Sequence, residues 1–291
     1  MNADIVVALT GAGLDPVEVE RIVRTALDED LGPSRLDVTS VATIPDDQAD
    51  TADLVARADG VLAGLAVAAA VFDQVSPRTK WKDKARDGER VARGDVLATV
   101  TGPTRALLTA ERTALNLLCR MSGVATHTRA WADALAGSKT TVLDTRKTTP
   151  GLRILEKYAV RAGGGTNKRM GLYDVAMIKD NHKLAAGGLT AAYRRVRESF
   201  PDVAVQVEVT TVAEAVESVE AGATFLLCDN MSPALLREVV AAVGDRAELE
   251  ATGGLTLEVA PEYAATGVDY LSVGALTHSS PILDIALDLR P

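Results

Sequence analysis

The sequence contains few aromatic residues, few histidines and only two cysteines. Aromatic side chains make up 3% of the 291 residues, which argues against a surface that stacks the bases of single-stranded nucleic acids. The three histidines, His127, His182 and His278, are scattered and do not predict a histidine metal site. Cys119 and Cys228 lie far apart, and Cys228 belongs to an apolar run, so we expect two buried free thiols rather than a disulfide.

Long apolar segments are also missing. No run approaches the ~18 apolar residues of a membrane-spanning helix. Asp4 interrupts the short apolar stretch at the N-terminus, and no basic residue precedes it, so no secretory signal is predicted. We therefore expect a cytoplasmic protein without a membrane partner. The net charge of −9 argues against a general nucleic-acid-binding or anionic-membrane surface.

Positive charge is concentrated in one segment of this acidic chain. Between Asp144 and Lys183, nine Lys or Arg residues stand against four Asp or Glu residues. Some of these charges must lie on solvated helix faces. A concentration of cations in an otherwise acidic protein nevertheless suggests a pocket for a small polyanion.

From about residue 140 onward, short apolar runs alternate with helical patterns. Helices are predicted at 211–220 and 232–240, the second with Ser232 as N-cap and Pro233 at its first position. Such repeats predict parallel strands with right-handed crossovers, in a barrel or a doubly wound sheet. No G-x-G-x-x-G follows the first strand, which argues against a dinucleotide-binding domain. The predicted strands are residues 140–144, 175–179, 203–208, 224–229, 247–250 and 268–273.

The first part of the chain is organised differently. A helical pattern follows Asp15 and Pro16, and strand-like segments at 52–60 and 96–101 are separated by turn-rich, charged stretches. These features indicate a smaller α+β domain. A long helical pattern from 103 to about 119 leads into the second domain, and the alternating segment 282–289 is predicted to be a strand that returns to the first.

Polar residues and glycines stand at the ends of the predicted parallel strands. In a parallel α/β barrel, these carboxyl ends form the functional face. One charged strand end is most simply explained as a solvated loop residue or a structural ion pair, but six in succession favour a single site. These ends are residues 144–147, 179–180, 208, 229, 252–254 and 274–275.

The residue types at these ends suggest roles. Arg146, Lys147 and Arg169 can bind carboxylate or phosphate groups. Lys179 ends an apolar strand, and could be a charge clamp or, when desolvated, a Schiff-base nucleophile. The triple glycine at 163–165 permits the loop that follows it to wrap around an anion.

Two acids and two glycine turns complete the predicted site. Glu208 and Asp229 suit a divalent cation that holds a pyrophosphate, or they suit ribose hydroxyls, since Mg²⁺ prefers oxygen ligands and often keeps its waters. The turns at 252–254 and 274–275 follow the last two strands, where barrels frequently bind a phosphate on backbone N–H groups.

Ten motifs together resemble those of the quinolinate phosphoribosyltransferase family, over nearly the whole chain. They are ERTALN (111–116), SGVAT (122–126), DTRKTTPGLR (144–153), EKYAVR (156–161), GGG (163–165), GLYD (171–174), IKDNH (178–182), VEV (207–209), EATGG (250–254) and SVGALTH (272–278).

The resemblance implies an α/β fold with two domains. An N-terminal α/β sandwich domain would comprise residues 1–111, with 277–291 returning to it, and an incomplete α/β barrel would comprise 112–276. The implied activity is transfer of a phosphoribosyl group from phosphoribosyl pyrophosphate (PRPP) to quinolinate with decarboxylation. The products would be nicotinate mononucleotide, pyrophosphate and CO₂, in de novo NAD biosynthesis.

The resemblance also implies Mg²⁺ and at least a homodimer, in which Arg112 enters the neighbouring subunit's site. Lys147, Lys179, Glu208 and Asp229 are the expected catalytic residues, and the two acids are expected to hold the metal through water. The full set of expected substrate-binding residues is Arg112, Thr145, Arg146, Lys147, Lys168, Arg169, Lys179, Glu208, Asp229, Thr252, Gly253, Gly254, Gly274, Ala275 and Leu276.

One position departs from the family pattern. The family usually has a histidine between the asparagine and the arginine of the 167–169 loop, where this chain has Lys168. A lysine is cationic at neutral pH, whereas histidine titrates near ~6.5. We therefore expect anion binding to persist with a different geometry and pH dependence.

Three other interpretations remain open. A molybdenum-transport-associated phosphoribosyltransferase would share the phosphate site, but the motifs at 144–153 and 178–182 argue against it. A Schiff-base lyase built on Lys179 is the leading interpretation without the resemblance. A non-catalytic oligomer would bind anions without turnover.

Overall fold

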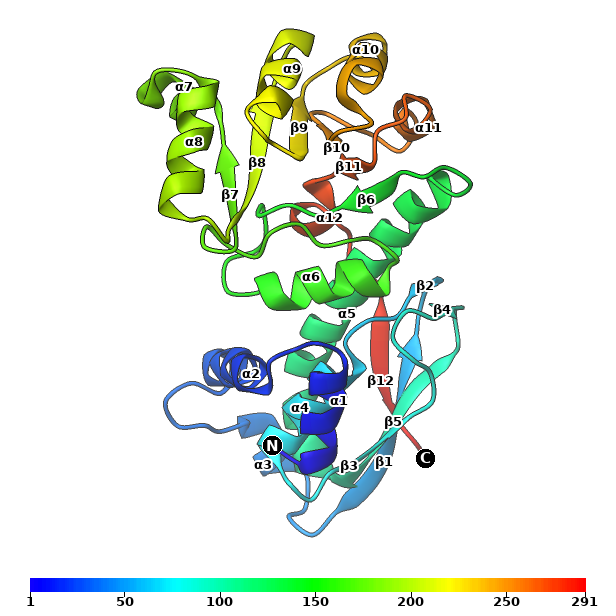
Figure 1. Cartoon of the computed structure of the whole chain (residues 1–291). Coiled ribbons are helices and arrows are strands. Elements are labelled where there is room, and N and C mark those ends of the chain that lie inside the picture. The colour runs from blue at the N-terminus through cyan, green and yellow to red at the C-terminus, as the bar shows by residue number, and fades with distance from the viewer. The chain divides into compact units, whose positions relative to one another are not determined.

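The computed structural model describes all 291 residues, which form two compact units (Figure 1). Unit 1 comprises Met1–Arg129, Thr149–Gly164 and Ser279–Pro291, and unit 2 comprises Ala130–Thr148 and Gly165–His278. This division differs from the expected boundary between residues 111 and 112. Both the expected boundary and the division after Arg129 fall inside the continuous helix α5 (Thr104–Ala134), so no linker marks either of them.

Unit 1 is built on a four-stranded antiparallel sheet. Its strand order is β12-β1-β5-β3, with β1 at Ala49–Ala56, β3 at Lys80–Asp83, β5 at Val96–Pro103 and β12 at Ile285–Leu289. The alternating C-terminal segment thus pairs with β1, from Ala52 opposite Leu289 to Ala56 opposite Ile285. A small second sheet pairs β2 (Gly60–Val61) with β4 (Arg90–Val91).

Unit 1 contains six helices, the first three of which begin at a side-chain cap. They are α1 (Ala3–Gly11), α2 (Pro16–Leu31), α3 (Val38–Thr43), α4 (Leu65–Val75), most of α5, and α6 (Arg153–Ala162). The Asp15 side chain accepts a hydrogen bond from the N–H of Val17, and Pro16 takes the first helical position of α2. The buried residues of α2 recur at helical spacing, at Val19, Ile22, Val23 and Leu27, and α2 packs against α4.

Unit 2 contains a six-stranded parallel sheet in the order β6-β11-β10-β9-β8-β7. The strands are β6 (Thr141–Leu143), β7 (Val175–Ile178), β8 (Ala204–Val209), β9 (Phe225–Asp229), β10 (Glu248–Thr252) and β11 (Tyr270–Ser272). All six strands that the sequence predicts are present. Because β6 and β7 lie at opposite ends of the order and do not pair with each other, the barrel is incomplete, and the predicted fold class is confirmed.

The helices of unit 2 connect these strands. They are α7 (Asp180–Ala186), α8 (Leu189–Ser199), α9 (Val212–Glu220), α10 (Pro233–Val243), α11 (Ala260–Ala264) and α12 (Ala275–His278). Ser232 caps α10 by accepting a hydrogen bond from the N–H of Leu235, as predicted, and Thr211 caps α9 in the same way. Helices α8 and α9 both pack against β8, on the outer side of the sheet (Figure 1). The carboxyl ends of the strands are left for the loops that carry polar residues.

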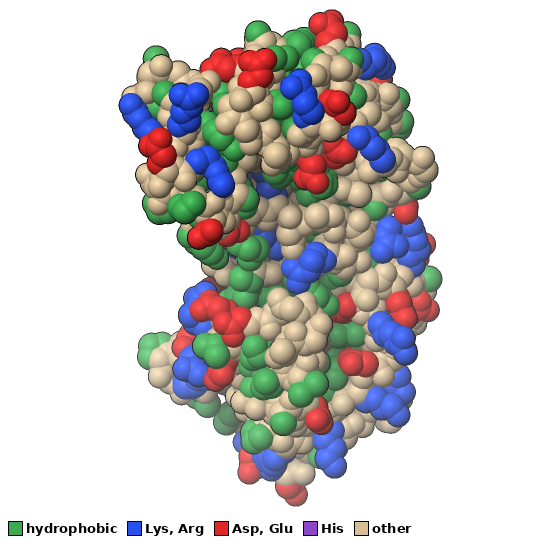
Figure 2. All heavy atoms as spheres, viewed as in Figure 1, with side chains coloured by type: hydrophobic (Ala, Val, Ile, Leu, Met, Phe, Trp, Pro, Cys, Tyr) green, Lys and Arg blue, Asp and Glu red, His purple; other side chains and the backbone are tan.

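Two further observations concern the whole chain. Across the 291 residues, no helix combines the length and the apolar character needed to span a bilayer. On the face drawn in Figure 2, acidic and basic side chains are interspersed rather than separated into areas of one sign. The cationic segment of the sequence therefore does not form a broad basic surface on that face.

Candidate active site

A cavity of about 380 Å³ opens at the carboxyl ends of the parallel strands in unit 2. Every strand of the sheet contributes to its wall, either by its last residues or by the loop that follows. The side chains meet because parallel strands deliver their carboxyl ends to one edge of the sheet. The lining residues are Thr145, Arg146, Lys147, Lys168, Arg169, Met177, Lys179, Glu208, Leu227, Asp229, Glu250, Thr252 and Ser272.

Nine of the predicted site residues are among these lining residues: Thr145, Arg146, Lys147, Lys168, Arg169, Lys179, Glu208, Asp229 and Thr252. The remaining predicted residues lie elsewhere. Gly253 and Gly254 follow β10, and Gly274 leads into α12, whose first residues are Ala275 and the buried Leu276. Arg112 lies in α5 of unit 1 and is exposed.

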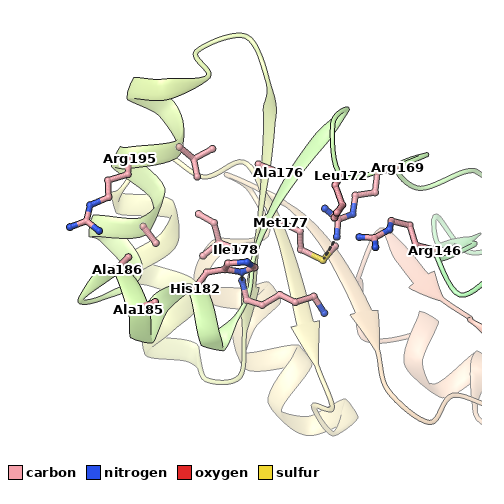
Figure 3. Close-up of a pocket in the computed structure, with 13 residues that line it drawn as sticks. Arg146, Arg169, Leu172, Ala176, Met177, Ile178, His182, Ala185, Ala186 and Arg195 are labelled. Carbon is pink, nitrogen blue, oxygen red and sulfur yellow. Dashed lines mark hydrogen bonds between the residues drawn. The ribbon is translucent and has the colours of Figure 1, made fainter.

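The basic side of the cavity is formed by two neighbouring arginines. Arg169 donates a hydrogen bond to the carbonyl of Val175 at 2.9 Å and another to the sulfur of Met177 at 3.5 Å. Figure 3 shows the guanidinium groups of Arg146 and Arg169 pointing into the same space beside Met177. Burial, together with the charge of Arg146, lowers the pKa of Arg169. An anion placed between the two arginines would relieve this repulsion.

A second, more apolar cavity of about 570 Å³ shares these arginines. Its other walls come from the loop before β7 and from β7, α7 and α8. They include Ala192, and Leu172 and Ile178, which Figure 3 shows. Lys179 also borders both cavities. The two cavities together offer cations beside an apolar wall, which suits a flat, acidic molecule.

The acidic side is formed by Glu208 and Asp229. An oxygen of Glu208 lies 3.3 Å from the ammonium of Lys179, and Asp229 accepts a hydrogen bond from the side chain of Asn230 at 2.9 Å. No group of three or more metal-ligating side chains exists in the chain. Two carboxylates without a third ligand fit Mg²⁺, which keeps several waters and shares its coordination with substrate phosphates.

A buried polar cluster in the wall of the cavity was not predicted. Glu250 is fully buried, and its Oε1 accepts hydrogen bonds from the ammonium of Lys168 and the hydroxyl of Ser272. Its Oε2 accepts a hydrogen bond from the buried amide of Gln206 at 2.5 Å. Strand alternation carried a signal, because Gln206 and Glu250 stand two residues before Glu208 and Thr252 and so face the same side.

The 167–169 loop is anchored at its backbone by Asp144. This carboxylate is fully buried and accepts hydrogen bonds from the amide of Asn167 at 2.6 Å and from the N–H of Lys168 at 2.8 Å. Burial lowers the pKa of Lys168, and the neighbouring Glu250 carboxylate opposes that effect. The loop is thus tied to Asp144, which follows β6, and to Glu250 in the middle of β10.

The glycine turn after β10 has no room for a side chain. Gly253 has a φ of +106°, and a Cβ placed there would lie 2.1 Å from the side-chain oxygen of Asn230. Gly274 lies close to Lys147, since a Cβ on it would be 3.2 Å from the Cδ of that lysine. The hydroxyl of Thr277 donates to the carbonyl of Lys147 at 2.9 Å. The start of α12 therefore supports Lys147 at the edge of the cavity.

Five basic side chains, with the carboxylates of Glu208 and Asp229, at the mouth of an incomplete α/β barrel define an enzyme of the class that handles small, highly anionic substrates. Residues 37–122 match the family described as quinolinate phosphoribosyl transferase, N-terminal domain, and residues 124–288 match its C-terminal domain. The chain belongs to the quinolinate phosphoribosyltransferase family.

Individual relatives agree over nearly their full length. The chain is 48% identical to the nicotinate-nucleotide pyrophosphorylase (carboxylating) of Mycobacterium leprae, over 92% of this chain and 95% of the relative. It is 40% identical to the probable enzyme of the same name from Bacillus subtilis, over 95% of each. The crystal structure of NadC from Streptococcus pyogenes superposes with a TM-score of 0.91 at 36% identity, covering 95% of this chain and 98% of that one.

Proposed function

We propose that the cavity at the barrel mouth joins quinolinate to the ribose of PRPP, releasing pyrophosphate and CO₂ and leaving nicotinate mononucleotide. Family membership makes the chain a decarboxylating phosphoribosyltransferase of NAD biosynthesis. One observation supports placing the reaction here: Arg146, Lys147, Lys168, Arg169 and Lys179 line one cavity together with Glu208 and Asp229. Both substrates carry several negative charges, and this is where the chain gathers cations.

The arginine pair is proposed to bind the quinolinate carboxylates. Arg146 and Arg169 can each present a planar fork to a carboxylate, and the apolar wall beside Met177 can pack on the face of the pyridine ring. Lys179 would complete this side as a compact charge. Nicotinate lacks one carboxylate and would leave part of this charge unpaired, which costs about 1–3 kcal/mol or more and favours the dicarboxylate.

The other side of the cavity is proposed to hold PRPP. Thr252, with the glycine turn after it, and Lys147, which α12 supports, would bind the 5′-phosphate. Glu208 and Asp229 would face the ribose and hold Mg²⁺ through water. The metal, when bound, supplies positive charge that stabilises the leaving pyrophosphate.

The chemistry then requires positioning more than covalent help. The pyridine nitrogen forms a bond to C1 of the ribose while the bond from C1 to the pyrophosphate oxygen breaks. The transition state resembles an oxocarbenium ion, so oriented charges and close approach lower the barrier. Once ribosylated, the ring nitrogen is cationic and can accept the electron pair released as CO₂ departs. The carbon left behind then takes a proton.

The alternative lyase mechanism is not favoured by the surroundings of Lys179. Its side chain is half exposed and pairs with Glu208. A Schiff-base nucleophile needs a desolvated lysine, whereas this side chain contacts both water and a carboxylate. Charge clamping is therefore the role that this geometry supports.

We further propose a cytoplasmic homodimer in which Arg112 of one chain completes the cavity of the other. The exposed position of Arg112 on α5 leaves it available to a second copy. Arg112→Ala should then lower turnover without changing the thermal unfolding temperature, because an exposed side chain contributes little to stability. Full activity in that variant would remove the shared site.

The decisive assay supplies the purified protein with PRPP and Mg²⁺, and with quinolinate or nicotinate separately. Formation of mononucleotide and release of labelled CO₂ from quinolinate are expected, with little product from nicotinate. The absence of CO₂ from quinolinate would exclude the proposed reaction.

A further inference from the structure

Lys168 lines the cavity and donates a hydrogen bond from its ammonium to Glu250, which lines the same cavity. Its side chain is almost fully buried, and Glu250 has no exposed surface. Two other cations, Arg169 and Lys179, add positive charge around it. A buried carboxylate without a cation is costly, so Lys168 is the counter-charge that Glu250 requires.

The acceptor capacity of Glu250 is taken up by donors from three other parts of unit 2. Ser272 comes from β11, Gln206 from β8 and Lys168 from the loop before β7. Glu250 itself lies level with Leu227 of β9, and Leu227 lies level with Glu208 of β8. The carboxylate therefore links strands on both sides of β10 across the interior of the barrel.

Lys168 is fixed at both ends by buried acids. Its N–H donates to Asp144, and its ammonium donates to Glu250. The next residue, Arg169, leaves this anchored point and reaches Val175 and Met177 on β7. The direction of the Arg169 side chain thus depends on where Lys168 is held.

We propose that Glu250 and Lys168 form one positioning unit, which fixes the 167–169 loop so that Arg169 presents its guanidinium to a substrate carboxylate. In this assignment Lys168 pairs with Glu250 during turnover and does not bind the substrate itself. The inference rests on the proposed function, because quinolinate supplies the carboxylate that Arg169 would meet. It assigns Glu250 a role that the sequence did not indicate, and it differs from the expectation that Lys168 is a substrate contact.

A double-mutant cycle tests this assignment. Steady-state kinetics would be compared for the wild type, Lys168→Met, Glu250→Gln and the double variant. Each single change should lower kcat/KM for quinolinate by about 100-fold, because a displaced binding group costs about that much. The double variant should lose no more than either single variant, since partners in one unit are not additive.

The two competing roles predict different kinetics. If Lys168 bound the substrate directly, Glu250→Gln would free its ammonium, so KM for quinolinate would fall or stay unchanged. The fold-losses in kcat/KM of the two single variants would then multiply in the double variant, as they do for independent changes. Either result would overturn the assignment. A positioning role also predicts that KM rises for quinolinate while KM for PRPP stays within about twofold of the wild type.

Control variants separate positioning from general damage. Glu248→Gln changes an exposed carboxylate on the same strand and should leave the kinetics as in the wild type. Lys168→Arg keeps the positive charge and should recover part of the activity lost in Lys168→Met.

A structural readout keeps the test valid if the single variants are too unstable to assay. The double variant should unfold at a higher temperature than either single variant, because it removes both buried charges together. Additive destabilisation would contradict the pair. An inactive wild type would instead exclude the proposed function, while the unfolding cycle would still report on the pair.

Discussion

The cavity contains two lysine and glutamate pairs that differ in their access to water. Lys168 and Glu250 have side chains that are 10% and 0% exposed. Lys179 and Glu208 lie 3.3 Å apart with side chains that are 50% and 12% exposed. The same two residue types, in one site, are thus placed in a buried pair and in an open pair.

Access to water decides what each pair can do. An exposed ion pair contributes only about 0–1 kcal/mol. Lys179, whose side chain is 50% exposed, can therefore change partner at low cost when a charged substrate arrives. Separating a buried pair leaves a charge without solvent or partner, at about 3–5 kcal/mol. The open pair is therefore suited to binding substrate and metal, and the buried pair to holding the site in shape.

The largest expected effect comes from removing Lys179 or Arg146, two cations that line the cavity. Lys179→Ala and Arg146→Ala should each reduce quinolinate turnover by about 10³-fold, because charge that stabilises the transition state is lost. The rate of CO₂ release measures this. Wild-type rates in both variants would show that the chemistry does not occur at the barrel mouth.

A stability measurement sharpens the comparison of the two pairs. Lys168→Met should lower the free energy of unfolding by about 3–5 kcal/mol, and the matched change Lys179→Met by less than about 1 kcal/mol. Urea unfolding of both variants at neutral pH gives these values. Equal losses would mean that burial does not distinguish the pairs.

Replacing Lys168 by histidine tests the charge of the buried pair through pH. Lys168→His should remain active where the imidazole is protonated, since it can still donate to Glu250. The imidazole is charged below its pKa in the folded protein and loses that charge as the pH rises through that pKa. In the unfolded chain the pKa of a histidine is ~6.5. The kcat/KM of the variant should therefore fall with rising pH where that of the wild type stays level. An identical pH profile in the two proteins would argue that the charge at this position is unimportant.

The smallest expected effect concerns Asp174, a carboxylate paired with backbone rather than with a cation. Burial alone would raise its pKa, but hydrogen bonds donated by the N–H groups of Met170 and Gly171 outweigh burial and lower it. A carboxyl with a lowered folded pKa adds stability above its unfolded value of ~3.9 and loses that contribution as the pH falls through the folded value.

Asp174→Asn should therefore destabilise the protein by about 1 kcal/mol at pH 7, the usual net worth of a hydrogen bond. The difference in the free energy of unfolding between this variant and the wild type should shrink as the pH falls through the folded pKa of Asp174. Urea unfolding of both proteins at pH 7 and at acidic pH would measure it. A difference that does not change with pH would mean that ionisation of Asp174 is not involved.

Much of the fold could be predicted because its signals are local. The six parallel strands of unit 2 appear as short apolar runs, and the caps at Asp15 and Ser232 mark where helices begin. The parallel arrangement then places strand ends at one edge, which is why nine predicted residues line one cavity. The boundary between the units could not be predicted in this way, because α5 is one uninterrupted helical pattern.

The buried pair could not be predicted because its partners meet only after the register of the sheet is fixed. Lys168 and Glu250 are 82 positions apart in the sequence. Gln206 and Ser272 join them from strands on either side of β10. Nothing in the local sequence around Lys168 indicates that Glu250 will be its partner.

The strand β12 has a consequence for how the protein is made. Unit 1 includes the last thirteen residues of the chain, Ser279–Pro291, and its sheet is complete only when β12 lies beside β1. During synthesis the ribosome must therefore produce all of unit 2 before the sheet of unit 1 can close. Until then β1 has one unpaired edge, a site for pairing with other chains. A nascent chain stalled before β12 should consequently be prone to aggregation.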